Sequence, residues 1–248
     1  MLLEPKGSDY GFFRYIGEQG EVRNLSVSGT IRPSGSQEQI GGLAGVNYGL
    51  ISECSFQGRV DGLASVGAIA GMNKTTGRIA SCTSEAAVFA TDDTGGIVGV
   101  NEGFVDACTS RSSVNTEELQ PTLDLGEMDL GTLNLTQNVV TRNNMGGIAG
   151  RSTGVISDCV NEGLVGFRHS GYNVGGIAGC QSGIISGCEN FGTVYGRKDV
   201  GGIAGQAAPF VEAEYLEDTG RQTQEDVTRL GNTLKQISST LIATSYEG

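Results

Sequence analysis

The chain has 248 residues and a net charge of −12, a balance that argues against nucleic acid and anionic membrane surfaces as partners. No apolar run approaches the ~18 residues that a membrane-spanning helix needs. Glycine supplies 41 of the 248 residues, more than twice its usual share, so a repetitive architecture is tested first.

A five-residue glycine phrase occurs six times, as GGLAG, GAIAG, GGIVG and three copies of GGIAG. The copies begin at Gly41, Gly67, Gly95, Gly146, Gly175 and Gly201. Successive starts lie 26, 28, 51, 29 and 26 residues apart, so one interval holds an insertion and the others describe a unit of about 27. No Lys-Ser/Thr follows the glycines and no G-x-G-x-x-G loop is present, so we expect no nucleotide or other cofactor site.

The second half of the unit also repeats, as in GLISECSFQGRV and GVISDCVNEGLV. Five cysteines share one position of the repeat, and Leu25 takes that position in an earlier unit. Short apolar positions between Asn/Ser-Gly turns indicate strands, at spacings too tight for helices. We therefore predict an all-β fold, a single-stranded parallel β-helix (a β-solenoid) of about six coils, with three short strands in each coil.

Three details of this solenoid can be predicted. The isoleucines of the phrase should stack as an internal ladder of Ile69, Ile97, Ile148, Ile177 and Ile203. The glycines should lie where the chain bends or where stacked backbones crowd. Ile185 and Cys188 are an odd number of residues apart, so a bend or bulge is expected between them.

The pattern GGIAG…G.I..C...G.V resembles the GLUG-motif repeats of large secreted and surface-displayed bacterial proteins, including adhesins and non-catalytic regions of surface proteases. The resemblance covers Tyr10 to Gly205, and the opening YGFFRYIGEQGEVRNLSVSGTI looks like the start of such an array. It implies an extracellular or cell-surface location, with this chain a fragment of a longer protein. The resemblance carries no catalytic residues over to this chain.

The cysteines have two interpretations. Neighbours in a stack at ~4.8 Å could form disulfides in a secreted chain. We favour buried free thiols acting as small apolar rungs, because the column of Cys54, Cys82, Cys108, Cys159 and Cys188 is odd in number and Leu25 extends it, with Cys180 elsewhere in its coil. No C-x-x-C pair occurs and the one histidine, His169, is interpreted as a loop residue, so no metal site is predicted.

Length variation is concentrated at one corner of the coil. Between the Val that ends the repeated part and the next phrase, the connections hold 6, 6, 31, 9 and 6 residues. Insertions in solenoids collect on one face, often the binding face, so we expect partner contacts at residues 32–39, 117–129 and 166–173.

The longest connection, residues 115–144, carries five acids and alternating Leu and Met. We interpret it as a strand-like flap on the solenoid wall and keep calcium binding as an alternative without a known ligand spacing. The acids are Glu117, Glu118, Asp124, Glu127 and Asp129.

The predicted organisation is a solenoid over residues 1–210 with the insertion at 115–144, followed by an amphipathic helix in 211–248. In the helix, Val227, Leu230, Leu234, Ile237 and Leu241 follow a 3-4-3-4 spacing, which suits a cap on the solenoid or the start of a coiled coil.

We predict a non-enzymatic extracellular module, an adhesin segment or stiff spacer whose corner loops contact a protein or glycan. The alternative is a pectinase-like β-helix enzyme acting on acidic polysaccharide, which would need grouped carboxylates. Asp106 and Asp158 fall in adjacent columns rather than one, and no Trp is present for sugar stacking. The sequence therefore predicts no catalytic, cofactor-binding or metal-binding residues. A pure scaffold without a ligand is a third class.

Overall fold

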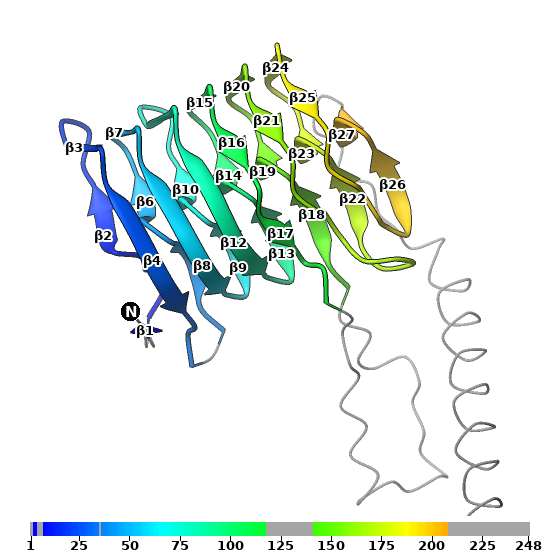
Figure 1. The fold of residues 1–248 in the computed structure, drawn as a ribbon, viewed down its shortest axis with the longest axis horizontal. Coiled ribbons are helices and arrows are strands. Elements are labelled where there is room, and N and C mark those ends of the chain that lie inside the picture. The colour runs from blue at the N-terminus through cyan, green and yellow to red at the C-terminus, as the bar shows by residue number, and fades with distance from the viewer. Residues whose placement is uncertain (1, 4–6, 35, 118–140, 208–248) are drawn as a thin grey trace, which may run out of the picture. The chain divides into compact units, whose positions relative to one another are not determined.

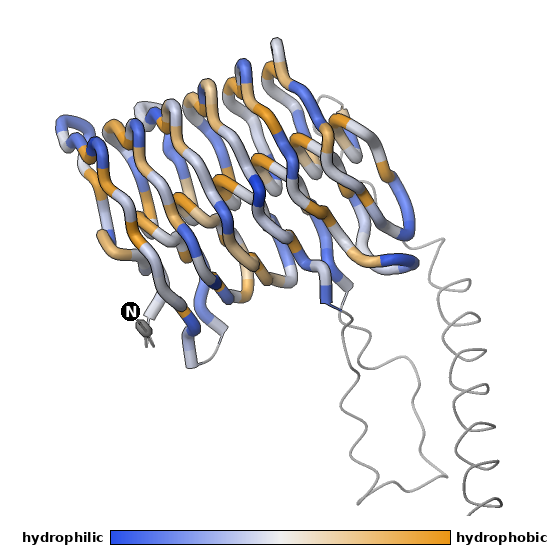
Figure 2. Tube along the Cα trace, in the orientation of Figure 1, coloured by the Kyte–Doolittle hydropathy of each residue, from blue (hydrophilic) through white to orange (hydrophobic). Residues whose placement is uncertain are grey.

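The computed structural model describes residues 2–3, 7–34, 36–117 and 141–207. In these residues the chain is entirely β, wound into a solenoid of about six coils in which every strand pairs in parallel with its equivalents in neighbouring coils (Figure 1). The predicted β-solenoid is confirmed. Hydrophobic segments recur at the same places from coil to coil (Figure 2). The predicted helix in 211–248 and most of the insertion lie outside the described residues.

Each complete coil contributes to four parallel sheets, which we number in the order in which the chain visits them. Sheet 1 holds the strands that end at the first glycine of each phrase: β5 (Glu38–Gly41), β9 (Ala64–Gly67), β13 (Asp92–Gly95), β18 (Asn143–Gly146), β22 (Tyr172–Gly175) and β26 (Lys198–Gly201). Sheet 2 holds the strands that begin inside the phrase, preceded by β2: β2 (Phe13–Ile16), β6 (Ala44–Asn47), β10 (Ala70–Asn73), β14 (Val98–Asn101), β19 (Ala149–Ser152), β23 (Ala178–Gln181) and β27 (Ala204–Ala207).

Sheet 3 holds the strands just before the cysteine column: β3 (Glu21–Arg23), β7 (Leu50–Ser52), β11 (Arg78–Ala80), β15 (Phe104–Asp106), β20 (Val155–Ser157) and β24 (Ile184–Ser186). Sheet 4 follows the cysteines, and β1 pairs with its first long strand: β1 (Leu2–Leu3), β4 (Ser26–Ile31), β8 (Ser55–Asp61), β12 (Thr83–Phe89), β16 (Thr109–Ser110), β17 (Ser113–Val114), β21 (Val160–Asn161) and β25 (Glu189–Asn190).

The prediction of three strands per coil was wrong, because sheet 1 was mistaken for part of a loop. The second residue of every sheet 1 strand has a left-handed backbone, as at Ser65 (φ 56°) and Asp93 (φ 49°). A left-handed residue reverses the local direction of the side chains, so the strand shows no alternation of apolar and polar residues. These strands are therefore invisible to a search for a period of two.

The bend predicted between Ile185 and Cys188 is confirmed. Gly187 has a φ of 63°, and the residue before the column position is left-handed in every coil. The set is Asn24, Glu53, Ser81, Ala107, Asp158 and Gly187. The left-handed conformation costs a residue such as Ala107 about 1–2 kcal/mol, and its methyl side chain makes no local hydrogen bond that would offset this cost. The strand pairing with neighbouring coils must therefore stabilise the left-handed backbone.

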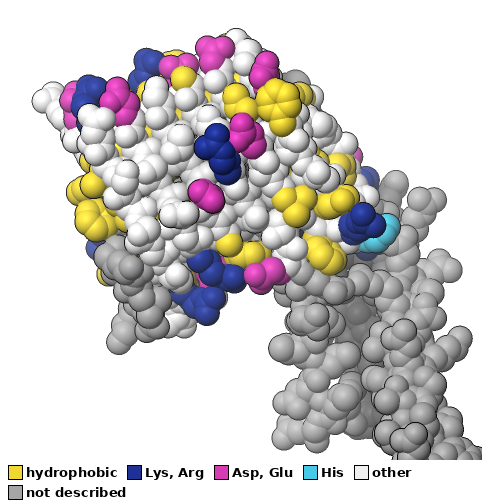
Figure 3. All heavy atoms as spheres, in the orientation of Figure 1, with side chains coloured by type: hydrophobic (Ala, Val, Ile, Leu, Met, Phe, Trp, Pro, Cys, Tyr) yellow, Lys and Arg dark blue, Asp and Glu magenta, His cyan; other side chains and the backbone are white. Residues whose placement is uncertain are grey.

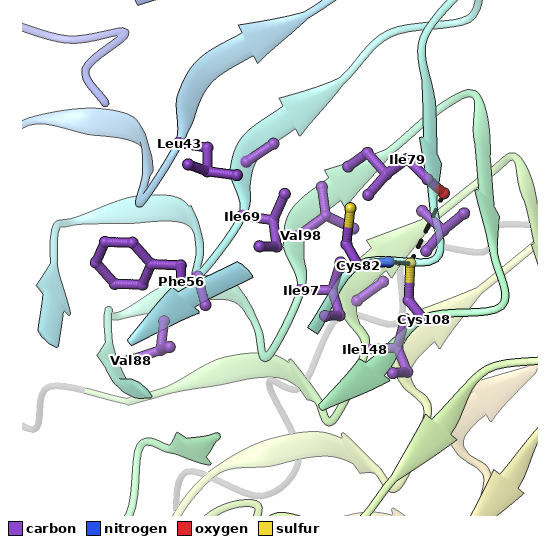
Figure 4. Close-up of a cluster of buried hydrophobic side chains, with 14 of the residues drawn as sticks. Leu43, Phe56, Ile69, Ile79, Cys82, Val88, Ile97, Val98, Cys108 and Ile148 are labelled. Carbon is purple, nitrogen blue, oxygen red and sulfur yellow. Dashed lines mark hydrogen bonds between the residues drawn. The ribbon is translucent and has the colours of Figure 1, made fainter. Parts of the chain in front are cut away.

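The predicted isoleucine ladder forms the centre of the core. Ile69, Ile97, Ile148 and Ile177 are fully buried, and Leu43 extends the column toward the N-terminus (Figure 4). Their backbones are linked as well, since the amide of Ile97 donates to the carbonyl of Ile148 over 3.0 Å. Ile203 is 41% exposed because it belongs to the last coil described.

The glycines of the phrase allow two strands to meet without side chains between them. A Cβ on Gly41 would lie 2.0 Å from the carbonyl oxygen of Ala44, across the turn. A Cβ on Gly150 would lie 2.4 Å from the backbone of Asp93 and Thr94, in sheet 1 of the preceding coil. Such contacts are impossible for a side chain, so the first and third glycines serve the close approach of sheets 1 and 2.

The cysteines are free thiols, as favoured from the sequence. Cys82, Cys108 and Cys159 are fully buried, Cys54 nearly so, and Cys188, the last cysteine of the column, is half-buried. Each amide of Cys82, Cys108 and Cys159 donates to the Sγ of the next cysteine at 3.4 Å. Burial raises the pKa of the Cys54 thiol, which keeps it protonated and unreactive.

Sheet 2 carries a buried amide ladder that the sequence analysis did not single out. Asn47 Nδ2 donates to Asn73 Oδ1 and Asn73 Nδ2 donates to Asn101 Oδ1, both at 2.8 Å. Asn101 Nδ2 then donates to Ser152 Oγ at 3.1 Å. The same amides bond to carbonyls of the following turns, for example Asn73 to Gly77, so these fully buried polar groups are satisfied.

Candidate interaction surface

Three of the four corners keep a nearly constant length. The connections from sheet 1 to sheet 2 and from sheet 3 to sheet 4 are two residues long in every coil, as at 42–43 and 53–54. The connection from sheet 2 to sheet 3 lengthens at residues 17–20 and 74–77. The connection from sheet 4 to sheet 1 varies far more, between residues 62–63 in one coil and 115–142 in another. We call this connection the variable corner.

The variable corner of the first coils is built around Asp61. Its carboxylate accepts from Arg32 Nε at 2.8 Å and from Arg59 Nε at 2.8 and 3.0 Å. Arg59 also pairs with Glu117 at 3.1 Å and lies over the ring of Phe89, with its guanidinium carbon 4.2 Å from the centroid. Every positive charge here faces a carboxylate, so this part of the corner is close to neutral.

The long insertion leaves and re-enters the solenoid through a fixed base. Asn115 is fully buried, accepts from the amide of Ala90 at 3.0 Å and donates to Thr94 Oγ1 at 3.1 Å. Arg142, only 7% exposed, donates to the carbonyls of Asn115 at 3.1 Å and Glu117 at 2.7 Å. Burial lowers the pKa of Arg142. Of the five acids of the predicted flap, the structure describes only Glu117, and the other four lie outside the described residues.

The variable corner of the last coils carries basic and aromatic side chains. The turn at residues 166–171 closes through the amide of Ser170, which donates to the carbonyl of Phe167 at 3.2 Å. The carbonyl of Gly171 accepts from the amide of Arg197 at 2.9 Å, which joins this turn to the connection of the next coil. Arg168 Nη2 donates to the hydroxyl of Tyr195 at 3.4 Å, with its guanidinium carbon 5.1 Å from the ring centroid.

His169 lies in this turn with its side chain exposed and a left-handed backbone, φ 59°. The structure thus places it in a loop, as interpreted from the sequence. Among the described residues, no group of three or more His, Cys, Asp and Glu side chains could hold a metal ion.

The acids considered for an enzyme stand in separate columns, as predicted. Asp106 is in register with Ser157, whose hydroxyl donates to Asp106 Oδ1 at 2.7 Å, and Arg78 pairs with Asp106 Oδ2 at 3.1 Å. Asp158 follows Ser157 and occupies the left-handed position before Cys159. Asp106 is therefore engaged in structural contacts rather than paired with Asp158 across a substrate site.

A buried acid, Asp93, was missed by the sequence analysis. It is 7% exposed, pairs with Arg151 at 2.9 Å and accepts from Asn144 Nδ2 at 2.9 Å. Burial raises the pKa of Asp93 above its ordinary value, against the opposing effect of Arg151. Asp93 stands out only because it is buried at the left-handed position of a sheet 1 strand, and this position is visible only in the structure.

Comparison with known proteins found no matching family model, no matching curated protein and no matching solved structure. None of the described residues forms a helix long and apolar enough to cross a membrane. The class of protein is thus defined by the fold alone, a parallel β-solenoid with one variable corner.

Proposed function

We propose that this chain is a non-enzymatic extracellular binding module, of the GLUG-repeat type, whose variable corner contacts a protein or glycan on a cell surface. The observation that carries the proposal is the restriction of large length changes to one corner of an otherwise uniform coil. A connection is free to change where it carries no core packing, and surface loops on a rigid scaffold are where binding residues collect.

The contacts at this corner support a binding role. Asn115 and Arg142 anchor the insertion to the solenoid through buried hydrogen bonds, so the corner presents its loops from a rigid base. The thiols of Cys54, Cys82, Cys108 and Cys159 are buried in the core and Asp106 is held by Arg78 and Ser157, which leaves these groups with structural roles. The same coils can also act as a stiff spacer, because each coil adds length along one axis.

The test compares two shortened loops on an array of purified glycans and extracellular matrix proteins. In the first variant, residues 32–37 are replaced by the Gly-Leu found at 62–63. In the matched control, residues 74–77 are replaced by the Tyr-Gly found at 48–49, which shortens a different corner to a length its neighbours already have. Both proteins should keep their β-sheet circular dichroism. Loss of array binding in the first and not in the second supports the proposal, whereas equal binding by both contradicts a role for this corner segment.

The non-enzymatic part is tested separately. The intact chain is incubated with polygalacturonate and with casein, with calcium added, and new reducing ends or free amino groups are measured. We expect no turnover. Cleavage of the glycan that disappears in Asp106→Asn or Asp158→Asn, with the fold preserved, would favour the pectinase-like alternative.

A further inference from the structure

A run of exposed apolar side chains crosses the outward face of sheet 3. The first residues of β15, β20 and β24 are in register from coil to coil, and their side chains point away from the core: Phe104, Val155 and Ile184. Phe104 is 49% exposed and Ile184 is 59% exposed, with the half-buried Val155 between them. We call these three residues the apolar ladder.

The fold does not require this ladder. In the three earlier coils the same position alternates between charged and apolar side chains, as Glu21, Leu50 and Arg78. Equivalent positions in a solenoid share one structural environment, so a polar side chain would serve the packing equally well. The continuous apolar run in the last three coils therefore calls for another explanation.

The adjoining face of sheet 4 becomes apolar in the same part of the solenoid. Val160 and Phe191 occupy outward positions there, and Phe191 is 71% exposed. In the four earlier coils the positions in register with Val160 all carry hydroxyl groups: Ser26, Ser55, Thr83 and Thr109. In Figure 3 hydrophobic side chains gather on the half of this face that holds the last coils, and no deep hollow opens between them. An exposed apolar area rimmed by polar side chains is typical of a protein-binding surface.

The polar rim of this surface is acidic. The stretches 104–111, 155–162 and 184–191 together hold four acids. Two of them are paired with arginines, Asp106 with Arg78 and Glu162 with Arg111. The other two, Asp158 and Glu189, are exposed, and neither forms a salt bridge with another residue in the described part of the chain. Two carboxylates therefore remain available to a positively charged partner.

The ladder is spaced like the turns of an α-helix. Neighbouring coils lie ~4.8 Å apart, so Phe104, Val155 and Ile184 span about 9.6 Å along the solenoid axis. A helix lying along this axis presents residues i, i+4 and i+7 on one side, over about 10.5 Å at ~1.5 Å per residue. An extended segment presents side chains on one side only every ~6.6 Å, so three of them would span about 13 Å. The helix fits the ladder better.

We propose that the apolar ladder, together with Val160 and Phe191, docks a basic amphipathic helix of a partner protein. The apolar side of the helix packs on the ladder, and its Lys or Arg side chains pair with Asp158 and Glu189. The free carboxylates repel acidic partners, including anionic lipid surfaces. The ladder lies on sheet 3, whereas the variable corner joins sheet 4 to sheet 1. This is therefore a second binding surface, and it goes beyond the proposed function.

The experiment measures binding of the full chain to a synthetic amphipathic helix of Leu and Lys, about 18 residues or ~5 turns long, by fluorescence anisotropy. Two comparison peptides are a Leu/Glu helix with the same pattern and a scrambled Leu/Lys peptide that has no apolar side. Each is measured at low and at physiological salt. We expect the Leu/Lys helix to bind best, because it alone combines an apolar side with positive charge.

The apolar contribution is tested with Phe104→Ser/Ile184→Ser. We expect binding of the Leu/Lys helix to weaken by about tenfold or more, since exposed apolar anchors carry much of the energy of such contacts. The control is Phe12→Ser, at a position that is 47% exposed in the first coil and far along the chain from the ladder. It should change binding by less than about twofold.

The charge contribution is tested with Asp158→Asn/Glu189→Gln. We expect about threefold weaker binding at low salt and a smaller loss at physiological salt, because salt screens exposed charges. The control, Glu18→Gln/Glu53→Gln, also removes two exposed carboxylates, and Glu53 occupies the same left-handed position before its cysteine as Asp158. It should change binding by less than about twofold.

Three results would overturn the inference: no binding of the Leu/Lys helix, equal binding of the Leu/Glu helix, or equal losses in the test and control variants. Light scattering and thermal melts of the free chain identify other occupants. A dimer that Phe104→Ser/Ile184→Ser separates would assign the surface to a second copy of the chain, and a melting temperature lowered more by this variant than by Phe12→Ser would show that the surface is already covered. Either outcome contradicts a partner helix. The array test of the variable corner uses other variants, so the proposed function stands or falls separately.

Discussion

Gly150→Ala tests whether the close approach of sheets 1 and 2 determines the sequence of the glycine phrase. The new Cβ would lie 2.4 Å from the carbonyl carbon of Asp93, and ordinary contact needs about 3.4 Å, so the two layers must separate by about 1.0 Å (3.4 − 2.4). The obstacle is backbone, which cannot rotate away as a side chain can. A gap of ~0.5–1 Å forfeits a quarter to a half of the contact energy of the atoms lining it, and overpacking of this kind costs about 1–3 kcal/mol.

Taking ~2 kcal/mol, the melting temperature should fall by about 4–8 °C, at ~2–4 °C per kcal/mol for a chain of this size. The assay is thermal unfolding followed by circular dichroism of the β signal, with urea unfolding as a second measure. Gly202→Ala is the matched control, because it lies in the same phrase in the last coil described and its Cβ meets nothing within 4 Å. A Gly150→Ala protein that melts within ~1 °C of the wild type would refute the steric explanation.

Three further predictions concern the core. Ile148→Asp should unfold several coils together, because it places an unpaired carboxylate where the side chain is fully buried. The control Ile203→Asp, at a 41% exposed position, should have only a mild effect on stability. A folded Ile148→Asp protein with an unchanged melting temperature would show that the isoleucine ladder is misassigned. Titration with a thiol reagent should find few reactive groups in the native protein and close to six after denaturation, and disulfides detected by mass spectrometry without reductant would contradict the free-thiol ladder. The raised pKa of Asp93 means that its contribution to stability is greatest below its ordinary value of 3.8 and is lost as pH rises through the folded-state value. The unfolding free energy of wild type relative to Asp93→Asn should therefore fall over that range and level off above it, and a difference that grows with pH would contradict the assignment.

The core was predictable from the sequence because identical positions recur in register. Ile97 and Cys108 could be assigned to interior columns from spacing alone, and the structure confirms both as fully buried. Sheet 1 could not be found this way, because the left-handed residue in each strand, such as Asn173, breaks the alternation that marks a strand.

The variable corner was predictable from loop lengths, but its charge distribution was not. Arg168 and Arg197 are 29 residues apart, as Asn161 and Asn190 are, so both pairs occupy equivalent places in consecutive units. An alignment of the repeats with charges marked would have shown the pairs Arg168-His169 and Arg197-Lys198 at one corner. The two connections are joined by the hydrogen bond from the amide of Arg197 to the carbonyl of Gly171, which the spacing of the residues does not reveal.

The amide ladder of sheet 2 bears on how such a chain can grow. Asn73 and Asn101 each accept from the coil before and donate to the coil after, so each of these coils presents an acceptor on one side and a donor on the other. Ile16 stands at the equivalent place before Asn47, and Ser152 stands after Asn101. Gene duplication of an Asn-bearing coil would insert a unit that fits its neighbours without any compensating change, whereas a copy of the first coil inserted among them would leave the amide donor of the coil before it without an acceptor, because Ile16 has none. The three Asn-bearing coils are thus interchangeable units, and the coils of Ile16 and Ser152 on either side of them limit where copies can be inserted.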